Sequence, residues 1–443
     1  MNWQPPGNSP EPVPAVPLGP SDILGAGAES QPRRRLARGA VMAVPVLLLG
    51  AGVAASLTLA GGSTASASSP DGAVRALLDA AQHGDLLGVL GTLEPSERDA
   101  LESGISRTAD QLERLQVLSQ DTDLSNISGI NLGFSDIKTS TTYLTPQRAA
   151  VTITSGTATS HVDPSRLPLG SFTRSVAGSA LAHAKPISSS TGATTGDNAI
   201  VAVQENGGWY VSLGYTAAED LARSAGQSAP PAGTSVPAVG SATPDDAIRA
   251  LVHSATDLDL AGVVKLTPPE EMAALHDYAP LFLAKADKAV SDVRSKLSIA
   301  VTRLDLADVA DGSGAELVTI KGVAFHATYE QYTVTYDGSC LTVSDAGNPS
   351  NDQHLCPTGS GLDSMLSSLP APLQPLVNDL RGIHPQEGLV AVQENGQWYF
   401  DPVRTVFTDI DNFLGALSLK DMNDIQSLVQ QSRSGSLSFG SGG

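Results

Sequence analysis

The chain carries one sequence pattern twice, and this internal repeat restricts its fold more than any other feature. Residues 69–101 and 243–275 align without a gap and are identical at 15 of 33 positions. A second pair of segments, 200–211 and 389–400, is identical at 9 of 12 positions. A repeat with so long a period predicts two copies of one domain rather than a solenoid of short units.

The segment before the first copy has the features of a membrane anchor. Residues 1–38 are rich in Pro and Gly and are predicted to be disordered. Residues 39–60 form an uncharged apolar run, long enough as a helix to cross a hydrocarbon core of about 30 Å. Arginines precede this run, so the positive-inside rule places the N-terminus in the cytoplasm. The prediction is a single-pass signal anchor in the cell membrane, with both copies extracellular.

A cleaved signal peptide is the alternative for the same segment. Ala65, Ser66 and Ala67 match the small-x-small pattern of a cleavage site, and cleavage near Ala67 predicts a secreted protein. Against cleavage, the apolar run is longer than the core of a usual signal peptide. Both interpretations export the same two domains.

The chain has two cysteines, Cys340 and Cys356. In an exported protein, an isolated pair predicts a disulfide. The offset between the copies is larger in the second matching pair than in the first, and the added length equals that of the segment 341–355, which the cysteines enclose. We therefore expect an insertion loop closed by its own disulfide. A metal site is disfavoured, because the spacing is wrong and His354 alone does not complete a tetrahedral set.

Composition excludes one class of partner. The chain has 46 acidic and 26 basic residues, for a net charge of −20. Because binding to phosphate backbones depends on Lys and Arg, we expect no nucleic-acid partner.

Both copies are predicted to place three helices before an antiparallel sheet. Ser69 and Thr243 are expected to cap the first helices, Asp85 and Asp259 begin the second, and the third follow Pro95 and Pro269 to about residues 119 and 298. Alternating apolar residues predict strands at 129–136, 148–155, 298–306 and 315–322. Segments 170–195 and 359–386 are expected to form short helices and loops. Asn206-Gly207 and Asn395-Gly396 predict closing hairpins.

These features predict the domain organisation. A stalk (61–68) leads to the first copy (69–223), a flexible linker (224–242), the second copy (243–431) and a flexible tail (432–443).

The helix order and the closing VQENGxWY motif resemble nuclear transport factor 2-like, or cystatin-like, domains, particularly the exported ones of high-GC bacteria. The resemblance implies an α+β fold: two tandem cone-shaped domains, each with three N-terminal helices on a curved antiparallel sheet, after a single transmembrane helix. Such a cone can enclose an apolar cavity, in which enzymes of the family place Asp, His or Tyr. Most exported members are regarded as sensory, binding or assembly modules.

Candidate pocket residues follow from this resemblance. Asp79 and His253 stand at equivalent positions of the first helices, where a titratable group could act as a general base. Trp209 and Trp398 could line a pocket. For all four, an ordinary surface or core position is the alternative.

Charged residues shared by the two copies are expected to be structural. The caps and exposed ion pairs predicted at helix starts are Asp71/Asp245, Arg75/Arg249, Asp85/Asp259 and Glu97/Glu271.

No catalytic motif is present, so the expected function is binding or scaffolding without a cofactor or metal. The prediction is a membrane-tethered extracytoplasmic protein of the cell envelope, whose partner is an envelope protein or a small ligand. The alternative is a hydrolase or isomerase that uses Asp79 or His253 in one cone cavity.

Overall fold

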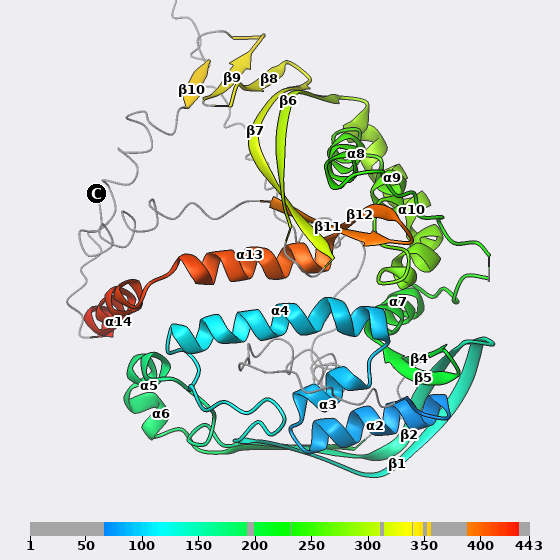
Figure 1. The fold of residues 1–443 in the computed structure, drawn as a ribbon, viewed down its shortest axis with the longest axis vertical. Helices are drawn as coiled ribbons and strands as arrows, with labels where there is room; N and C mark the ends of the chain where they lie inside the picture. The colour runs from blue at the N-terminus through cyan, green and yellow to red at the C-terminus, as the bar shows by residue number, and fades with distance from the viewer. Residues whose placement is uncertain are drawn as a thin grey trace, which may run out of the picture.

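The computed structural model describes residues 66–192, 199–231, 233–310, 314–338, 340–348, 352–355 and 388–433. Two antiparallel sheets with helices packed on them form the two halves of the molecule (Figure 1). The expectation of a mixed α and β chain with curved antiparallel sheets is therefore confirmed. Predictions for residues 1–38, 39–60 and 359–386 fall outside the described residues.

The first repeat places its helices before its sheet, as expected. The helices are α2 (Pro70–Gln82), α3 (Leu86–Gly91) and α4 (Pro95–Arg114). The remaining elements are β1 (Ile130–Thr145), β2 (Arg148–Val162), α5 (Ser171–Ala177), α6 (Ser179–Ala182), β3 (Ile187–Gly192), β4 (Ala199–Glu205), β5 (Gly208–Ser212) and α7 (Leu213–Ser224). The strand order is β1-β2-β4-β5, and β3 also pairs with β2.

The second repeat has the same plan. Its helices α8 (Pro244–Thr256), α9 (Leu260–Lys265) and α10 (Ala273–Arg294) precede β6 (Leu297–Ala310), β7 (Ala315–Tyr329), β8 (Tyr332–Tyr336), β9 (Leu341–Asp345), β10 (Gln353–Leu355), β11 (Gly388–Glu394) and β12 (Gln397–Asp401). Two helices, α13 (Pro402–Ala416) and α14 (Leu419–Arg433), end the described chain. Strands β6, β7, β11 and β12 pair as β1, β2, β4 and β5 do.

The predicted starts of the first two helices of each repeat, and both predicted hairpins, are confirmed. The side chain of Ser69 accepts a hydrogen bond from the Gly72 amide at 3.1 Å, and Asp85 accepts one from the Gly88 amide at 2.7 Å. Thr243 and Asp259 cap α8 and α9 in the same way. Both hairpin asparagines have the positive φ that their turns require, 49° at Asn206 and 51° at Asn395.

The Asp85 cap allows a direct test of local stability. We expect Asp85→Ala to lower the free energy of unfolding by about 1 kcal/mol, because the amide of Gly88 loses its acceptor at the start of α3. Urea unfolding would measure this loss. Asp99→Ala is the matched control, since Asp99 is exposed and pairs with its neighbour Arg98. Equal losses in the two variants would contradict a capping role.

The third helices differ from their predicted bounds for local reasons. Helix α4 ends at Arg114 rather than near 119, because the chain turns through a left-handed residue, Gln116 (φ 58°). Helix α10 begins at Ala273 rather than after Pro269. In the first repeat, the carboxylate of Glu94 caps α4, whereas the equivalent position in the second repeat is Pro268, which offers no side-chain acceptor.

The second repeat is longer than the first because one of its connections is longer and another is shorter, and not because of a single insertion. The connection from α9 to the start of β6 is shorter than the equivalent connection from α3 to the start of β1. Between β7 and β11, in contrast, the chain is much longer than between β2 and β4. Part of that length forms β8, β9 and β10, so the expected loop contains a β-hairpin. Cys340 is disulfide-bonded, and Cys356 lies outside the described residues.

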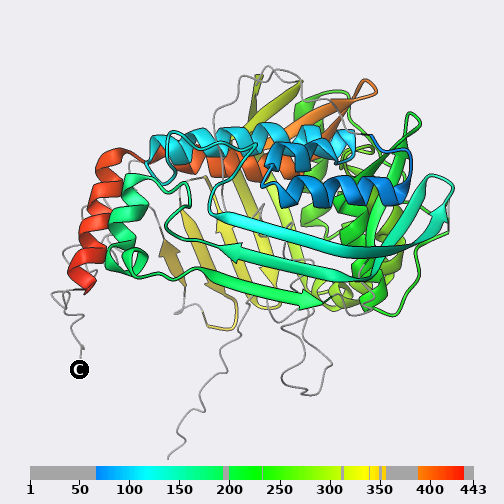
Figure 2. The same ribbon diagram turned by 90° about the horizontal axis from the view of Figure 1, so that it is seen from below.

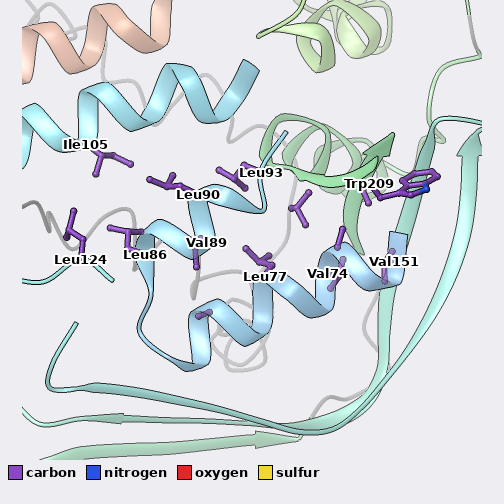
Figure 3. Packing of buried hydrophobic residues seen from close by; sticks show 14 of the residues in the cluster. Val74, Leu77, Leu86, Val89, Leu90, Leu93, Ile105, Leu124, Val151 and Trp209 are labelled. Carbon is purple, nitrogen blue, oxygen red and sulfur yellow. The ribbon is translucent and has the colours of Figure 1, made fainter. Parts of the chain in front are cut away.

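Side chains fill the space between helices and sheet in the first repeat. Val74 and Leu77 of α2 belong to one buried cluster with Leu90, Leu93 and Val151 of β2, and each of the five is at most 5% exposed (Figure 3). At roughly 25 cal/mol per Å² of apolar surface, burying such side chains is the main stabilising contribution to the layer.

Each repeat ends in a helix that packs against the other repeat. Helix α13, from the second repeat, lies alongside α4 of the first, and both views show the two helices side by side (Figures 1 and 2). Helix α7, from the first repeat, packs against α10 of the second. These terminal helices were not predicted, although they join the two repeats reciprocally.

The segment predicted to be a flexible linker is bonded to the second repeat. The amide of Val236 donates to the carbonyl of His276 at 2.9 Å, and the amide of Val239 donates to that of Lys265 at 2.7 Å. Ser241 then pairs with Trp398, as Ala67 of the predicted stalk pairs with Trp209. The described part of this segment is therefore bonded to the second repeat at Val236, Val239 and Ser241. The predicted tail begins inside α14, which ends at Arg433.

The assignment as a single-pass membrane protein requires correction. The proposed span, residues 39–60, lies outside the described residues. Across the part of the chain that the structure does describe, no helix has both the length and the apolar character needed to cross a membrane. The transmembrane assignment, and the predicted location at the cell membrane, are contradicted by this finding.

Candidate functional site

The two candidate general bases lie on exposed helix surfaces, each in its own repeat. The side chain of Asp79 is 75% exposed and lies 3.7 Å from His83, one turn along α2. The side chain of His253 is 79% exposed and lies 3.4 Å from Asp257, one turn along α8. The structure does not bring the two residues together.

The two tryptophans belong to the cores. Trp209 is 5% exposed and packs in the first-repeat cluster, with its ring edge-on to Tyr143 at a centroid distance of 6.0 Å. Trp398 is partly buried and packs against Ile248 and Val318 in the second repeat. Their position favours the structural alternative over pocket lining.

A groove opens between α2 and β1 in the first repeat, and Asp79 lines it. Its volume is about 520 Å³. One wall is the face of α2 that carries Arg75, Asp79 and Gln82, and the other comprises Phe134, Asp136 and Ile137 of β1. The Gln82 side chain accepts a hydrogen bond from the Phe134 amide at 3.1 Å and so ties helix to strand at one end.

Negative charge exceeds positive charge along the walls of this groove. Arg75 donates to Asp71 of its own helix at 2.7 Å, and Asp71 also accepts a hydrogen bond from Thr139 of β1. These hydrogen bonds lower the pKa of Asp71, the bond from Arg75 most of all. Because Asp71 compensates the guanidinium, the two remaining carboxylates, Asp79 and Asp136, give the groove a net negative charge.

In the second repeat, the equivalent arginine crosses from helix to strand. Arg249 of α8 donates to the carbonyl of Leu304 in β6 at 2.7 Å, while its distance to Asp245 is 3.8 Å. The predicted Asp–Arg pairs therefore exist in both repeats, but only in the second does the arginine bridge the helix and the sheet edge.

Glu97 lies in the first turn of α4, as predicted, but its carboxylate is not exposed. Its carboxylate accepts hydrogen bonds from the Ser212 hydroxyl at 2.6 Å, the Leu213 amide at 2.7 Å and the Gly214 amide at 2.9 Å. The carboxylate thus sits at the N-terminus of α7, where backbone amides and the helix dipole favour an anion. Burial raises the pKa of Glu97 to about 7, against the lowering effect of these three donors.

Glu271, its equivalent, is also buried and has a different partner. The Glu271 side chain is 4% exposed, and it pairs with Arg404 in the first turn of α13. The same guanidinium pairs with Asp401, whose side chain is fully buried. Burial and the neighbouring Asp401 raise the pKa of Glu271, and Arg404 opposes the shift. Ser212 and Asp401 are equivalent cap positions, so one repeat uses a hydroxyl where the other uses a carboxylate and an arginine.

These glutamates meet at the joint between the two repeats. A cavity of about 140 Å³ lies there, and the carboxylates that line it come from both repeats: Glu94, Glu97, Glu205, Glu270 and Glu271. We call them the joint glutamates. Burial raises the pKa of Glu205, and Glu94 and Glu270 raise it further. Among the described residues, no group of His, Cys, Asp and Glu could hold a metal ion.

The cluster of glutamates between the repeats could not be predicted from the sequence, because helices α7 and α13, which supply their partners, were not predicted. Glu97 and Glu271 were identified as a shared pair, but their partners lie in α7 and α13. One signal was present: apolar residues recur with helical spacing after each WY pair, in LGYTAAEDLA and VRTVFTDIDNFL.

Comparison of the chain with protein-family models, with curated proteins and with solved structures finds no match in any of the three.

Proposed function

We propose that this protein is a non-enzymatic binding scaffold, in which two tandem nuclear transport factor 2-like domains form one unit and the first presents a ligand groove between α2 and β1. The family assignment is supported by the order of three helices before a curved antiparallel sheet, repeated in both halves. It is also supported by the equivalent Asn-Gly hairpins that close each sheet.

One observation supports a binding role above all: the first repeat has a buried apolar core and, beside it, an open groove between α2 and β1. Buried apolar side chains of α2, α3 and α4 form one cluster with Val151 and Trp209 of the sheet in the first repeat (Figure 3). The groove at the edge of that layer remains open to a ligand. The exposed side chain of Asp79 can supply charge to an open binding surface. The hydrolase or isomerase alternative instead requires it as a general base inside a cone cavity, so the geometry favours binding.

The lining of the groove suggests the chemistry of its ligand. Leu78, Phe134 and Ile137 supply apolar surface, and Asp79 and Asp136 supply negative charge. A small number of polar groups on an apolar surface is typical of ligand sites. We therefore expect a ligand that combines an apolar group with a positive charge, such as a short peptide with a basic residue beside an aromatic one.

A peptide titration tests this function. Fluorescein-labelled peptides with Arg-Phe or Lys-Leu pairs are expected to bind, and the same peptides with Glu in place of the basic residue are not. Asp79→Asn combined with Asp136→Asn should weaken binding about tenfold, which corresponds to a combined loss of about 1.4 kcal/mol of binding free energy. Fluorescence anisotropy would measure the affinity, and hydrogen exchange would locate protection on α2 and β1.

Asp99→Asn is the matched control, because it removes an exposed carboxylate from α4, away from the groove. The proposal fails if basic and acidic peptides bind equally, or if the double variant and this control have the same affinity.

A further inference from the structure

The joint glutamates hold the first turns of both helices that cross between the repeats. Glu97 accepts three hydrogen bonds at the start of α7, which packs on α10. Glu271 pairs with Arg404 at the start of α13, which packs on α4. A change in the charge of this cluster therefore acts on both contacts between the repeats at once.

Charge at the joint is strongly unbalanced. The carboxylates that face it are Glu94 and Glu97 from α4, Glu205 from β4, Glu270 and Glu271 from the turn before α10, Glu394 from β11 and Asp401 from β12. The cations that act on them, within the described parts of the chain, are Arg98 and Arg404. Tyr215 also lines the cavity; its hydroxyl donates to Asp277, and Arg148 pairs with that carboxylate.

The surroundings of Glu205 and Glu271 favour the protonated form of their carboxyl groups. One oxygen of Glu205 and one of Glu271 are buried without a hydrogen-bond partner among the described residues. An ionised carboxylate without donors is costly to bury, whereas a protonated one is much less so. The pKa values of Glu205 and Glu394 are raised by burial first and by neighbouring glutamates second.

We propose that the joint glutamates form a proton-sensitive latch: Glu97, Glu205 and Glu271 keep the two repeats together while they hold protons, and their full ionisation beside Glu94 and Glu270 loosens the contact. Loss of the protons places like charges from both repeats around one small cavity. Their repulsion and the cost of burying them outweigh the donors at Glu97 and the Arg404 pair at Glu271, so α7 separates from α10 and α13 from α4. This latch is independent of the ligand groove, which lies within the first repeat.

The direction of the pH effect follows from the pKa shifts. A carboxyl group whose pKa is raised in the folded state, such as Glu97, binds more protons folded than unfolded between about pH 4.5 and 7. Stability from such a group is fully present below the unfolded pKa and is lost as the pH rises through the folded pKa. The joint should therefore be tightest in mild acid and loosest at pH 8 to 9.

Small-angle scattering and urea unfolding of the full chain at pH 5.5, 7.0 and 8.5 test the latch. We expect the radius of gyration to increase with pH, and the unfolding equilibrium constant to rise at least tenfold between pH 5.5 and 8.5. Glu205→Gln combined with Glu270→Gln removes two charges with little change in shape, and should reduce the rise to threefold or less. Glu330→Gln is the control, because Glu330 is exposed, pairs with Lys296 and lies away from the joint.

Three results would overturn the latch: a wild-type protein whose stability does not fall with pH, a double variant with the same pH dependence as wild type, or a radius of gyration that stays constant while stability falls. If the double variant does not fold, Glu394→Gln replaces it with the same expected direction, since that carboxylate accepts a hydrogen bond from the Glu270 amide at the joint.

Discussion

Arg404→Met is expected to destabilise the protein by about 3–5 kcal/mol at pH 8, because it leaves Glu271 and Asp401 buried without a cation. Both carboxylates have side chains at most 4% exposed, so water cannot replace the guanidinium. Urea unfolding at pH 8 would measure the loss. The loss should shrink at pH 5, since a carboxyl group that has taken up a proton no longer requires a cation.

A control and a rescue separate charge from packing in this experiment. Arg107→Met also removes an arginine that faces α13, but Arg107 and Asp411 are partly exposed and 3.9 Å apart, so the cost should stay below about 1 kcal/mol. Adding Glu271→Gln to Arg404→Met should recover part of the lost stability. Equal losses for Arg404→Met at pH 5 and pH 8 would contradict the electrostatic explanation.

The second large effect is expected at the contact between α4 and α13. A Cβ at Gly104 would overlap the Phe407 ring, and Phe407 packs against the first-repeat core. We therefore expect Gly104→Val to lower the free energy of unfolding by about 2–3 kcal/mol. Gly91→Val is the matched control, because a Cβ at Gly91 meets nothing within 4 Å.

A double-mutant cycle makes this prediction specific to the interface. Phe407→Ala alone should cost about 2–3 kcal/mol, less than a fully buried Phe would, because Phe407 is only partly buried. Combined with Gly104→Val, Phe407→Ala frees the space that the valine needs. The double variant should therefore lose less stability than the sum of the two single losses, by about 1 kcal/mol or more. Strict additivity would show that the two positions do not contact each other in solution.

At the contact between α7 and α10, the small and the large side chain are exchanged relative to Gly104 and Phe407. The residue equivalent to Gly104 in α10 is Tyr278, and the one equivalent to Phe407 in α7 is Ala218. Tyr278 is 3% exposed, and its hydroxyl donates to Glu219 of α7 at 2.7 Å. The two reciprocal contacts are therefore not interchangeable, although the repeats share one plan.

Local chemistry made much of each repeat predictable. A helix start is defined by one side-chain acceptor, as at Ser69 and Asp85 in the first repeat. A tight turn is defined by two residues with positive φ, as at Asn206-Gly207. These are short-range effects, so they can be recognised in sequence. The strand segments were located from alternation alone, but their lengths were underestimated, because pairing partners continue the strands beyond the alternating part.

Long-range contacts decided what local patterns could not. Glu97 and Glu271 look like ordinary first-turn glutamates, and only the arrival of α7 and α13 from distant parts of the chain buries them. The same holds for the connection at Val236 and Val239, whose composition is typical of a free linker but whose amides are bonded to the second repeat.

The sequence by itself determined that the protein consists of two copies of a helix-then-sheet domain, because capping, turn and alternation signals act within a few residues and occur in both copies. Only the tertiary structure decided how the copies join and where charge collects. Burial and the approach of distant carboxylates depend on which surfaces meet in space, and no local pattern encodes this.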